Sequence, residues 1–163
     1  MAVTTTLKLY FKTPDGKLIE ATPSTFLKVK PTEPVQFQVA ASVVGPQGSP
    51  TVYTSTAGSP LRPDAGRLEN WMVGDENGKE TPNASINSYG LFSAKKAGKY
   101  KIAALWTTVD DAGVAAGVQG SPTFVVEVVS SKLWLWLGGA AVLGLGTWWW
   151  MRRRSATKAL KGW

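Results

Sequence analysis

The chain has 163 residues, with 18 Lys and Arg against 11 Asp and Glu, and it contains neither His nor Cys. Their absence excludes disulfide frameworks, zinc fingers, thiol nucleophiles and every mechanism that needs a histidine base. The net charge of +7 arises mostly in the tail, because residues 1–132 hold all 11 acids and 13 of the bases, whereas 152–163 hold five bases and no acid. The rest of the chain is therefore close to neutral, with charges of both signs.

Alternating apolar and polar residues predict β-strands in the first 130 residues. The runs 7–11, 35–43 and 124–128 have an apolar side chain at every second position, which is typical of strands with one buried face in an antiparallel sheet. Pro-Asp-Gly, Gly-Pro, Asn-Gly and Gly-Ser-Pro segments interrupt the strand-like pattern and favour turns. We therefore expect one all-β domain over 1–130, with a Pro, Gly and Ser-rich insertion near 44–68.

The stretch 69–106 resembles the second half of bacterial immunoglobulin-like domains of the group 2 type. In that family a tryptophan strand is followed by an Ala-x-Ile strand, a Gly turn, a Phe-x-Ala strand and a Gly-x-Tyr-x-Ile-x-Ala strand. The residues that carry the resemblance are Trp71, Ala84, Ile86, Gly90, Phe92, Ala94, Gly98, Tyr100, Ile102 and Ala104. The resemblance implies an Ig-like antiparallel β-sandwich, which usually serves as a spacer, an adhesin stalk or a module of cell-surface and phage structural proteins.

Seven residues are expected to define the core of this fold. Gly90 suits a tight connection that requires positive φ. Tyr100 lies two residues before Ile102, at the spacing of a tyrosine corner, whose hydroxyl bonds the backbone while its ring packs. Ile102 stands where antibody domains carry a disulfide cysteine, and we expect an apolar contact with Val39 in its place. The full set is Val39, Trp71, Gly90, Gly98, Tyr100, Ile102 and Trp106.

The charged groups of the body predict turns and solvated surface rather than chemistry. Asp110 and Asp111 precede Ala-Gly, and a hairpin turn is the favoured interpretation, with a calcium site as the alternative, because calcium needs six or more oxygen ligands. The segment 75–78, Asp-Glu-Asn-Gly, is explained in the same way by the hairpin geometry of Asn-Gly. The basic cluster at 95–101 is read as a solvated edge or turn rather than an anion site. We expect no enzymatic activity, metal or cofactor.

An uncharged apolar segment follows the body. Residues 133–151 contain no Asp, Glu, Lys or Arg and would form a helix of about 28 Å, close to the ~30 Å hydrocarbon thickness of a bilayer. Tryptophans stand near both ends, where indoles settle at membrane interfaces. The sequence predicts a transmembrane helix within 131–151, and its small residues would let a second helix approach in a homo-oligomer. The anchor residues are Trp134, Trp136, Gly138, Gly139, Ala140, Gly144, Trp148, Trp149 and Trp150.

The segment 152–163 is a basic tail next to this apolar run. Its cationic side chains suit contact with anionic lipid, or with nucleic-acid phosphate without sequence specificity. They are Arg152, Arg153, Arg154, Lys158 and Lys161. The positive-inside tendency would keep the tail in the cytoplasm and export the body, yet the N-terminus lacks the features of a signal peptide. A tail-anchored chain would have the reverse orientation, and both topologies stay open.

Together these features predict a non-enzymatic, single-pass membrane protein with a structural or assembly role. Its body is expected to bind a protein shell or surface assembly, for example as a minor capsid or membrane protein of a membrane-containing phage. The expected location is a virion internal membrane or a bacterial cell envelope, and the expected partners are the lipid bilayer, a protein of the assembly and nucleic acid at the tail. The alternative is a cell-surface adhesion or receptor-like module.

Overall fold

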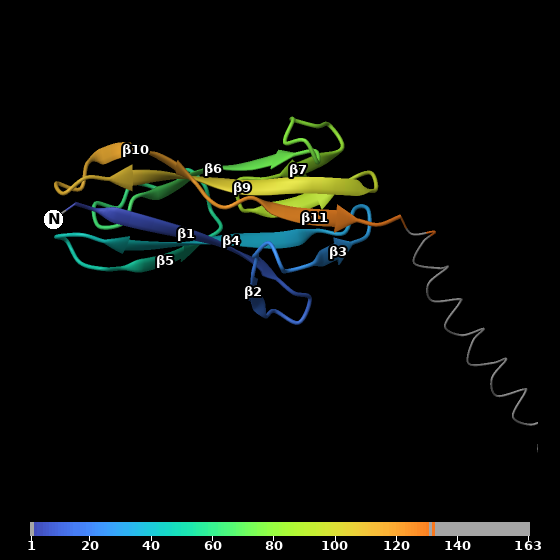
Figure 1. Cartoon of the computed structure of the whole chain (residues 1–163), viewed down its shortest axis with the longest axis horizontal. Coiled ribbons are helices and arrows are strands. Elements are labelled where there is room, and N and C mark those ends of the chain that lie inside the picture. The colour runs from blue at the N-terminus through green and yellow to red at the C-terminus, as the bar shows by residue number, and fades with distance from the viewer. Residues whose placement is uncertain (1, 131, 133–163) are drawn as a thin grey trace, which may run out of the picture. The chain divides into compact units, whose positions relative to one another are not determined.

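The computed structural model describes residues 2–130 and 132, and its body consists of β-strands (Figure 1). All of the strands belong to the unit that ends at Val128. The strands are β1 (Thr4–Lys12), β2 (Leu18–Glu20), β3 (Leu27–Val29), β4 (Val35–Val44), β5 (Thr51–Thr54), β6 (Arg67–Gly74), β7 (Ala84–Ile86), β8 (Leu91–Ala94), β9 (Gly98–Val109), β10 (Ala115–Gly120) and β11 (Phe124–Val128).

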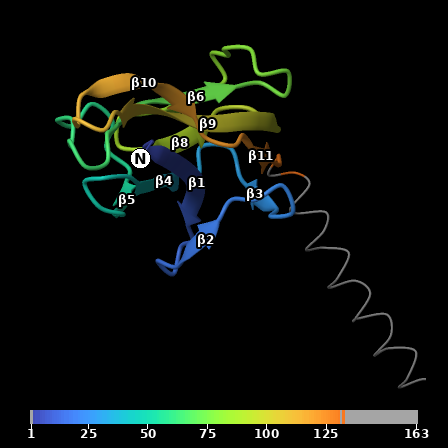
Figure 2. The same ribbon diagram turned by 60° about the vertical axis from the view of Figure 1, so that its left-hand side comes forward.

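The strands form two sheets that lie one above the other (Figure 2). The six-stranded sheet has the order β2-β1-β4-β8-β7, with β5 also paired to β4. The five-stranded sheet has the order β10-β9-β11-β3, with β6 also paired to β9. The prediction of an all-β body built mainly from antiparallel pairs is confirmed. One pair departs from it, because β3 runs parallel to β11, with Val126 opposite Leu27 and Val128 opposite Val29.

The inward faces of the strands follow the predicted period of two. In β1 the side chains of Leu7, Leu9 and Phe11 are buried, and their neighbours Lys8, Tyr10 and Lys12 lie on the outer face. The odd-numbered residues of β4 from Val35 to Val43 are buried in the same way. Strand formation in these runs is therefore explained by the apolar face that each strand buries against the other sheet.

Aromatic rings join the two sheets at the centre of the core. Phe37 of β4 is 0% exposed, and its ring centroid lies between 6.2 and 6.5 Å from four other ring centroids. Two of these rings, Trp71 of β6 and Phe124 of β11, belong to the opposite sheet. Such tilted and edge contacts are the favourable geometries for aromatic pairs. The core is thus shared by both sheets, as a face-to-face packing requires.

Most of the predicted core residues are buried. Val39 and Ile102 are buried in the common core on opposite sheets. Trp71 and Trp106 are also buried, and the Nε1 of Trp106 donates to the carbonyl of Ala65 at 2.9 Å. Gly98 differs, because it is exposed at the start of β9 with a φ of 154°, and so it does not belong to the buried core.

Tyr100 and Gly90 have the local geometry that the sequence predicts. The Tyr100 hydroxyl donates to the Lys96 carbonyl at 2.9 Å, which confirms the tyrosine corner. Gly90 has a φ of 75°, and a Cβ there would lie 2.6 Å from the carbonyl oxygen of Phe37. Only glycine fits this position without a shift of the backbone.

The Pro, Gly and Ser-rich segment 44–68 contributes a strand to the two-sheet body. Its strand β5 pairs with β4, with Thr54 opposite Val39 and Thr51 opposite Ser42. The Nε1 of Trp71 donates to the Ser55 carbonyl at 2.8 Å, so the core tryptophans hold this segment in place. Its Pro, Gly and Ser content therefore reflects a path of tight turns over the end of the sheets.

Candidate functional site

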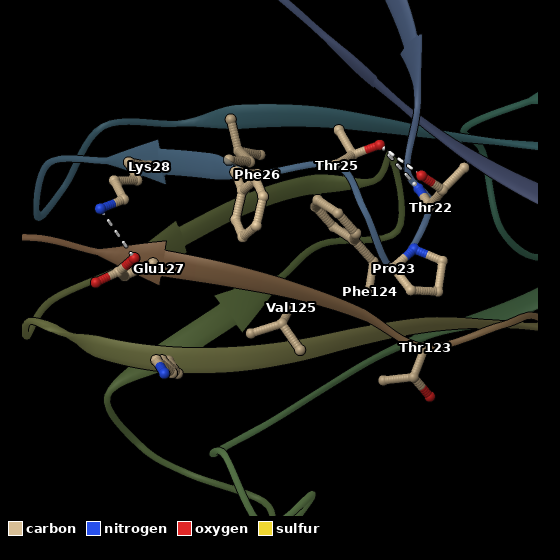
Figure 3. Close-up of a pocket in the computed structure, with 11 residues that line it drawn as sticks. Thr22, Pro23, Thr25, Phe26, Lys28, Thr123, Phe124, Val125 and Glu127 are labelled. Atoms are coloured by element: carbon tan, nitrogen blue, oxygen red, sulfur yellow. Dashed lines mark hydrogen bonds and ion pairs between the residues drawn. The ribbon is translucent and has the colours of Figure 1, made fainter.

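A groove lies at the edge of the five-stranded sheet, beside the parallel strands β3 and β11 (Figure 3). The cavity volume is about 290 Å³. Phe124 contributes the core side of the groove, while the ion pair between Lys28 and Glu127 stands at its rim with Nζ and Oε2 3.4 Å apart. The lining residues are Thr22, Pro23, Thr25, Phe26, Leu27, Lys28, Lys99, Thr123, Phe124, Val125 and Glu127.

Phe26 is the most exposed large apolar side chain among the described residues. Its exposed fraction is 86%, compared with 42% for Val125 across the groove. The turn before it is tied by hydrogen bonds, because the Thr25 hydroxyl donates to the Glu20 carbonyl at 2.9 Å and the Thr25 amide donates to the Thr22 carbonyl at 3.0 Å. A fixed turn therefore presents Phe26 to solvent.

The groove is suited to binding an apolar side chain. The side chains of Lys28 and Glu127 are 56% and 41% exposed, so water screens the ion pair between them. The apolar surface of Phe26 and Val125 is the part of the groove that gains from being covered. A partner with an apolar side chain next to a charged one would match both the apolar surface and the ion pair of the groove.

Phe26 is not among the residues that the sequence predicts to be functional, although one signal for it exists in the sequence. Phe26 and Leu27 are consecutive apolar residues. Successive side chains of a strand point to opposite faces, so only one member of such a pair can enter the core. Leu27 packs against the core, and Phe26 is left outside.

The acidic pair of the β9–β10 connection forms the predicted hairpin turn. Asp110 Oδ1 accepts hydrogen bonds from the amides of Ala112 and Val114, both at 2.9 Å. Gly113 supplies the positive φ of 77° that closes the turn. No group of three or more His, Cys, Asp or Glu that could hold a metal ion occurs in the described part of the chain.

The turn after β6 has the same construction, which corrects the reason expected for it. Asp75 Oδ1 accepts from the amides of Asn77 and Lys79 at 2.9 and 3.0 Å, and Gly78 has a φ of 78°. Gly78 therefore supplies the positive φ that the turn requires. The side chain of Asp75 closes the turn, and Asn77 contributes its backbone amide. The pattern is an acceptor side chain three residues before a glycine, rather than an Asn-Gly pair.

Four lysines form a basic surface at one end of the body. Lys95 and Lys96 occupy the turn between β8 and β9, and Lys99 and Lys101 alternate with the buried side chains of β9. Within the described residues, no ion pair joins any of the four to an acid. The side chains of Lys95, Lys96 and Lys99 are exposed, so this cluster is solvated, as the sequence predicts.

Exposed tyrosines lie on the six-stranded sheet and in the turn before β8. The rings of Tyr10 and Tyr53 are 6.0 Å apart on neighbouring positions of its outer face, and Tyr53 is 57% exposed. Tyr89 is exposed in the turn before β8. Ala40 lies between β1 and β5 on this outer face and is nevertheless buried. The tyrosine pair therefore covers part of the sheet and still presents aromatic surface to solvent.

The predicted anchor and tail residues lie outside the described part of the chain. They are Trp134, Trp136, Gly138, Gly139, Ala140, Gly144, Trp148, Trp149 and Trp150 for the anchor, and Arg152, Arg153, Arg154, Lys158 and Lys161 for the tail. Among the residues that are described, there is no helix whose length and apolar character would suffice for a membrane crossing.

Comparisons with protein-family models, with curated proteins and with solved structures found no match for this chain. Three surfaces among the described residues have a chemistry that suits binding: the groove with Phe26, the basic turn that begins at Lys95, and the aromatic surface of Tyr10 and Tyr53.

Proposed function

We propose that the chain is a non-enzymatic, single-pass membrane-anchored protein with a structural or assembly role. One observation carries the proposal: residues 133–151 contain no charged side chain, are bracketed by tryptophans and are followed directly by three arginines. Such a segment has the length of a bilayer crossing, and its flanks match the aromatic and basic residues found at membrane interfaces.

The body is proposed to be an Ig-like sandwich that binds a protein shell or surface assembly. The strand order supports this assignment, because β1, β4, β8 and β7 are neighbours in one sheet and β6, β9 and β10 in the other, as in Ig-like topology. The tyrosine corner at Tyr100 and the buried Trp71 on β6 are further Ig-like features. Phe26 supports a protein-binding role, because exposed aromatic side chains are common hot spots at interfaces.

A minor capsid or membrane protein of a membrane-containing phage fits this combination. In such a particle the body would contact the capsid, while the tail of the full chain would contact the packaged nucleic acid through phosphate neutralisation. Protease treatment of intact particles tests this arrangement. We expect the tail to be protected and to become accessible only after the membrane is disrupted, and free digestion of the tail would exclude it.

Flotation with lipid vesicles tests the anchor itself. The full chain is expected to float with the vesicles and to stay bound at high salt and alkaline pH, because an inserted apolar helix is not released by charge screening. Replacing Val142 and Leu145 by Arg places two charges near the bilayer centre, each costing about 2.5–3.5 kcal/mol on insertion scales, and should abolish flotation. The matched control replaces the same two residues by Ala, which keeps the segment uncharged. A full chain that stays monomeric in water without detergent or vesicles contradicts the proposal.

An adhesion or receptor-like module is the second candidate. The observation that favours it is the exposed aromatic surface formed by Tyr10 and Tyr53, since aromatic faces and polar tips suit contact with sugars or protein. Proteolysis of whole cells separates the two candidates. Loss of the body from intact cells indicates the adhesin, and protection indicates an internal assembly protein.

A further inference from the structure

Four lysines stand at the end of the body from which the chain continues to the apolar segment. The last residue of β11, Val128, is the register partner of Gly98, the first residue of β9. Figure 1 shows β11 running toward the end of the body at which β9 begins. Lys95 and Lys96 precede Gly98 in the chain, so they lie beside the point at which the chain leaves the body.

The turn that carries these lysines is fixed by the core. The hydroxyl of the buried Tyr100 donates to the Lys96 carbonyl at 2.9 Å, and the Lys95 amide donates to the Asn83 carbonyl at 2.7 Å. Both bonds use the backbone of the turn and leave the ammonium groups in solvent. Lys99 and Lys101 continue the basic surface along β9, on the face that does not enter the core.

The chain between the body and the apolar segment is short. Only residues 129–132 separate Val128 from residue 133, and four extended residues span at most about 14 Å. If the apolar segment lies in a bilayer, this tether holds the basic end of the body within about one to two Debye lengths of the headgroups. Lys132 adds a further positive charge to the tether itself.

We infer that Lys95, Lys96, Lys99 and Lys101 form a contact surface for anionic lipid headgroups. The inference rests on the proposed membrane anchor and adds the side of the body that faces the lipid. Charge complementarity supports it, because these lysines have no ion pairs within the described residues, whereas the opposite end of β9 leads into the acidic turn of Asp110 and Asp111.

Acids near the basic surface limit how the body is placed on the lipid. Glu127 lies opposite Lys99 on β11 but is paired with Lys28, and Asp75 and Glu76 lie in the turn that follows β6. Asp75 uses its Oδ1 to close that turn. The lipid contact is therefore centred on the β8–β9 turn and on Lys99, which lies opposite β11, while Lys101 lies opposite Gly74 and thus next to the β6 turn.

The test measures how fast each lysine of the full chain reacts with an amine-acetylating reagent, followed by peptide mass spectrometry. The chain is inserted into vesicles of phosphatidylcholine alone, or of phosphatidylcholine mixed with phosphatidylglycerol. We expect Lys95 and Lys96 to react about fivefold more slowly in the anionic vesicles, and the difference to vanish at about 1 M salt, where the Debye length falls to about 3 Å. Lys8, in the middle of β1, is the internal control and should react equally in both vesicles.

Two double variants separate the effect of the lysine charges from the effect of the shape of the turn. Lys95→Gln with Lys96→Gln keeps the backbone bonds of the turn and is expected to remove the protection of Lys99 and Lys101 in anionic vesicles. Lys12→Gln with Lys17→Gln removes two exposed lysines elsewhere and should leave that protection unchanged.

The outcomes distinguish this inference from the proposed anchor. A chain that does not float with either vesicle refutes the anchor. A chain that floats but whose lysines react at equal rates in both lipids keeps the anchor and overturns the lipid contact. If Lys95 and Lys96 react more slowly than the control Lys8, but by the same factor in both lipids, their shielding is steric and does not depend on lipid charge. That result also overturns the inference.

Discussion

Tyr100 shows how one side chain links the core to a surface turn. Its ring is buried and lies 6.1 Å from the ring of Phe92 on the opposite sheet, while its hydroxyl holds the Lys96 carbonyl. Burial raises the pKa of the Tyr100 hydroxyl above its usual value of 10.0, because the charged tyrosinate would lose solvation. The folded state therefore holds the Tyr100 proton more tightly than the unfolded state does.

Replacing Tyr100 by Phe is expected to lower the free energy of unfolding by about 1 kcal/mol at neutral pH, the usual net contribution of a hydrogen bond. The parent chain should lose stability as the pH rises above 10.0, because the unfolded state releases the proton first, and the Phe variant should lose less over that range. Urea unfolding at neutral and alkaline pH measures both effects. Tyr89→Phe, at an exposed position, is the control, and an equal loss in that variant contradicts the assigned role.

At the scale of elements, one turn design recurs in four places. In each, a Thr, Asp or Asn accepts amide hydrogen bonds through its side chain, and a glycine three residues later has positive φ. The acceptor and glycine pairs are Thr13 with Gly16, Asp75 with Gly78, Asn87 with Gly90, and Asp110 with Gly113. The shared spacing fits a tight turn closed by a left-handed glycine, and it is readable in the sequence.

Removing one acceptor tests this turn design. Asp75→Ala leaves the amides of Asn77 and Lys79 without their carboxylate acceptor and is expected to lower the free energy of unfolding by about 1 kcal/mol. Its neighbour provides the matched control, since Glu76→Ala removes an exposed carboxylate of the same turn and should change stability by less than about 0.5 kcal/mol. Chemical denaturation of both variants is the measurement, and equal losses would refute the role of Asp75.

Elements with one buried face were predictable, and those without one were not. The run 35–43 shows its period because alternate side chains enter the core. Strand β10 shows none, because all six of its residues are exposed and burial selects no face. β3 is three residues long, too short to reveal a period, and its parallel pairing with β11 depends on a partner about 100 residues away along the chain.

The candidate surfaces were predictable to different degrees. The basic cluster around Lys95 was visible because like charges stand close in sequence. Its position beside the exit of the chain was not, since that depends on the pairing of Val128 with Gly98. The groove was missed because Phe26, Lys28 and Val125 come from two distant segments.

For the whole molecule, the aromatic cluster around Phe37 decides whether the two sheets stay together. Phe37→Ala removes a ring that touches both sheets and is expected to lower the free energy of unfolding by about 3–5 kcal/mol, a large part of the total for a domain of this size. Phe26→Ala makes the same chemical change at an exposed position and should have little effect. Denaturant unfolding compares them, and similar losses would contradict the placement of the core.

The position of β11 also has a mechanical consequence. This strand carries the exit of the chain, and it is held on one side by β9 and on the other by β3. A force that pulls residue 129 along the strand direction must break the backbone hydrogen bonds to β9 and to β3 at the same time, instead of one after another. Tension along the tether would thus act on a strand that is hydrogen-bonded on both sides, whereas among the described strands β2 pairs with β1 alone.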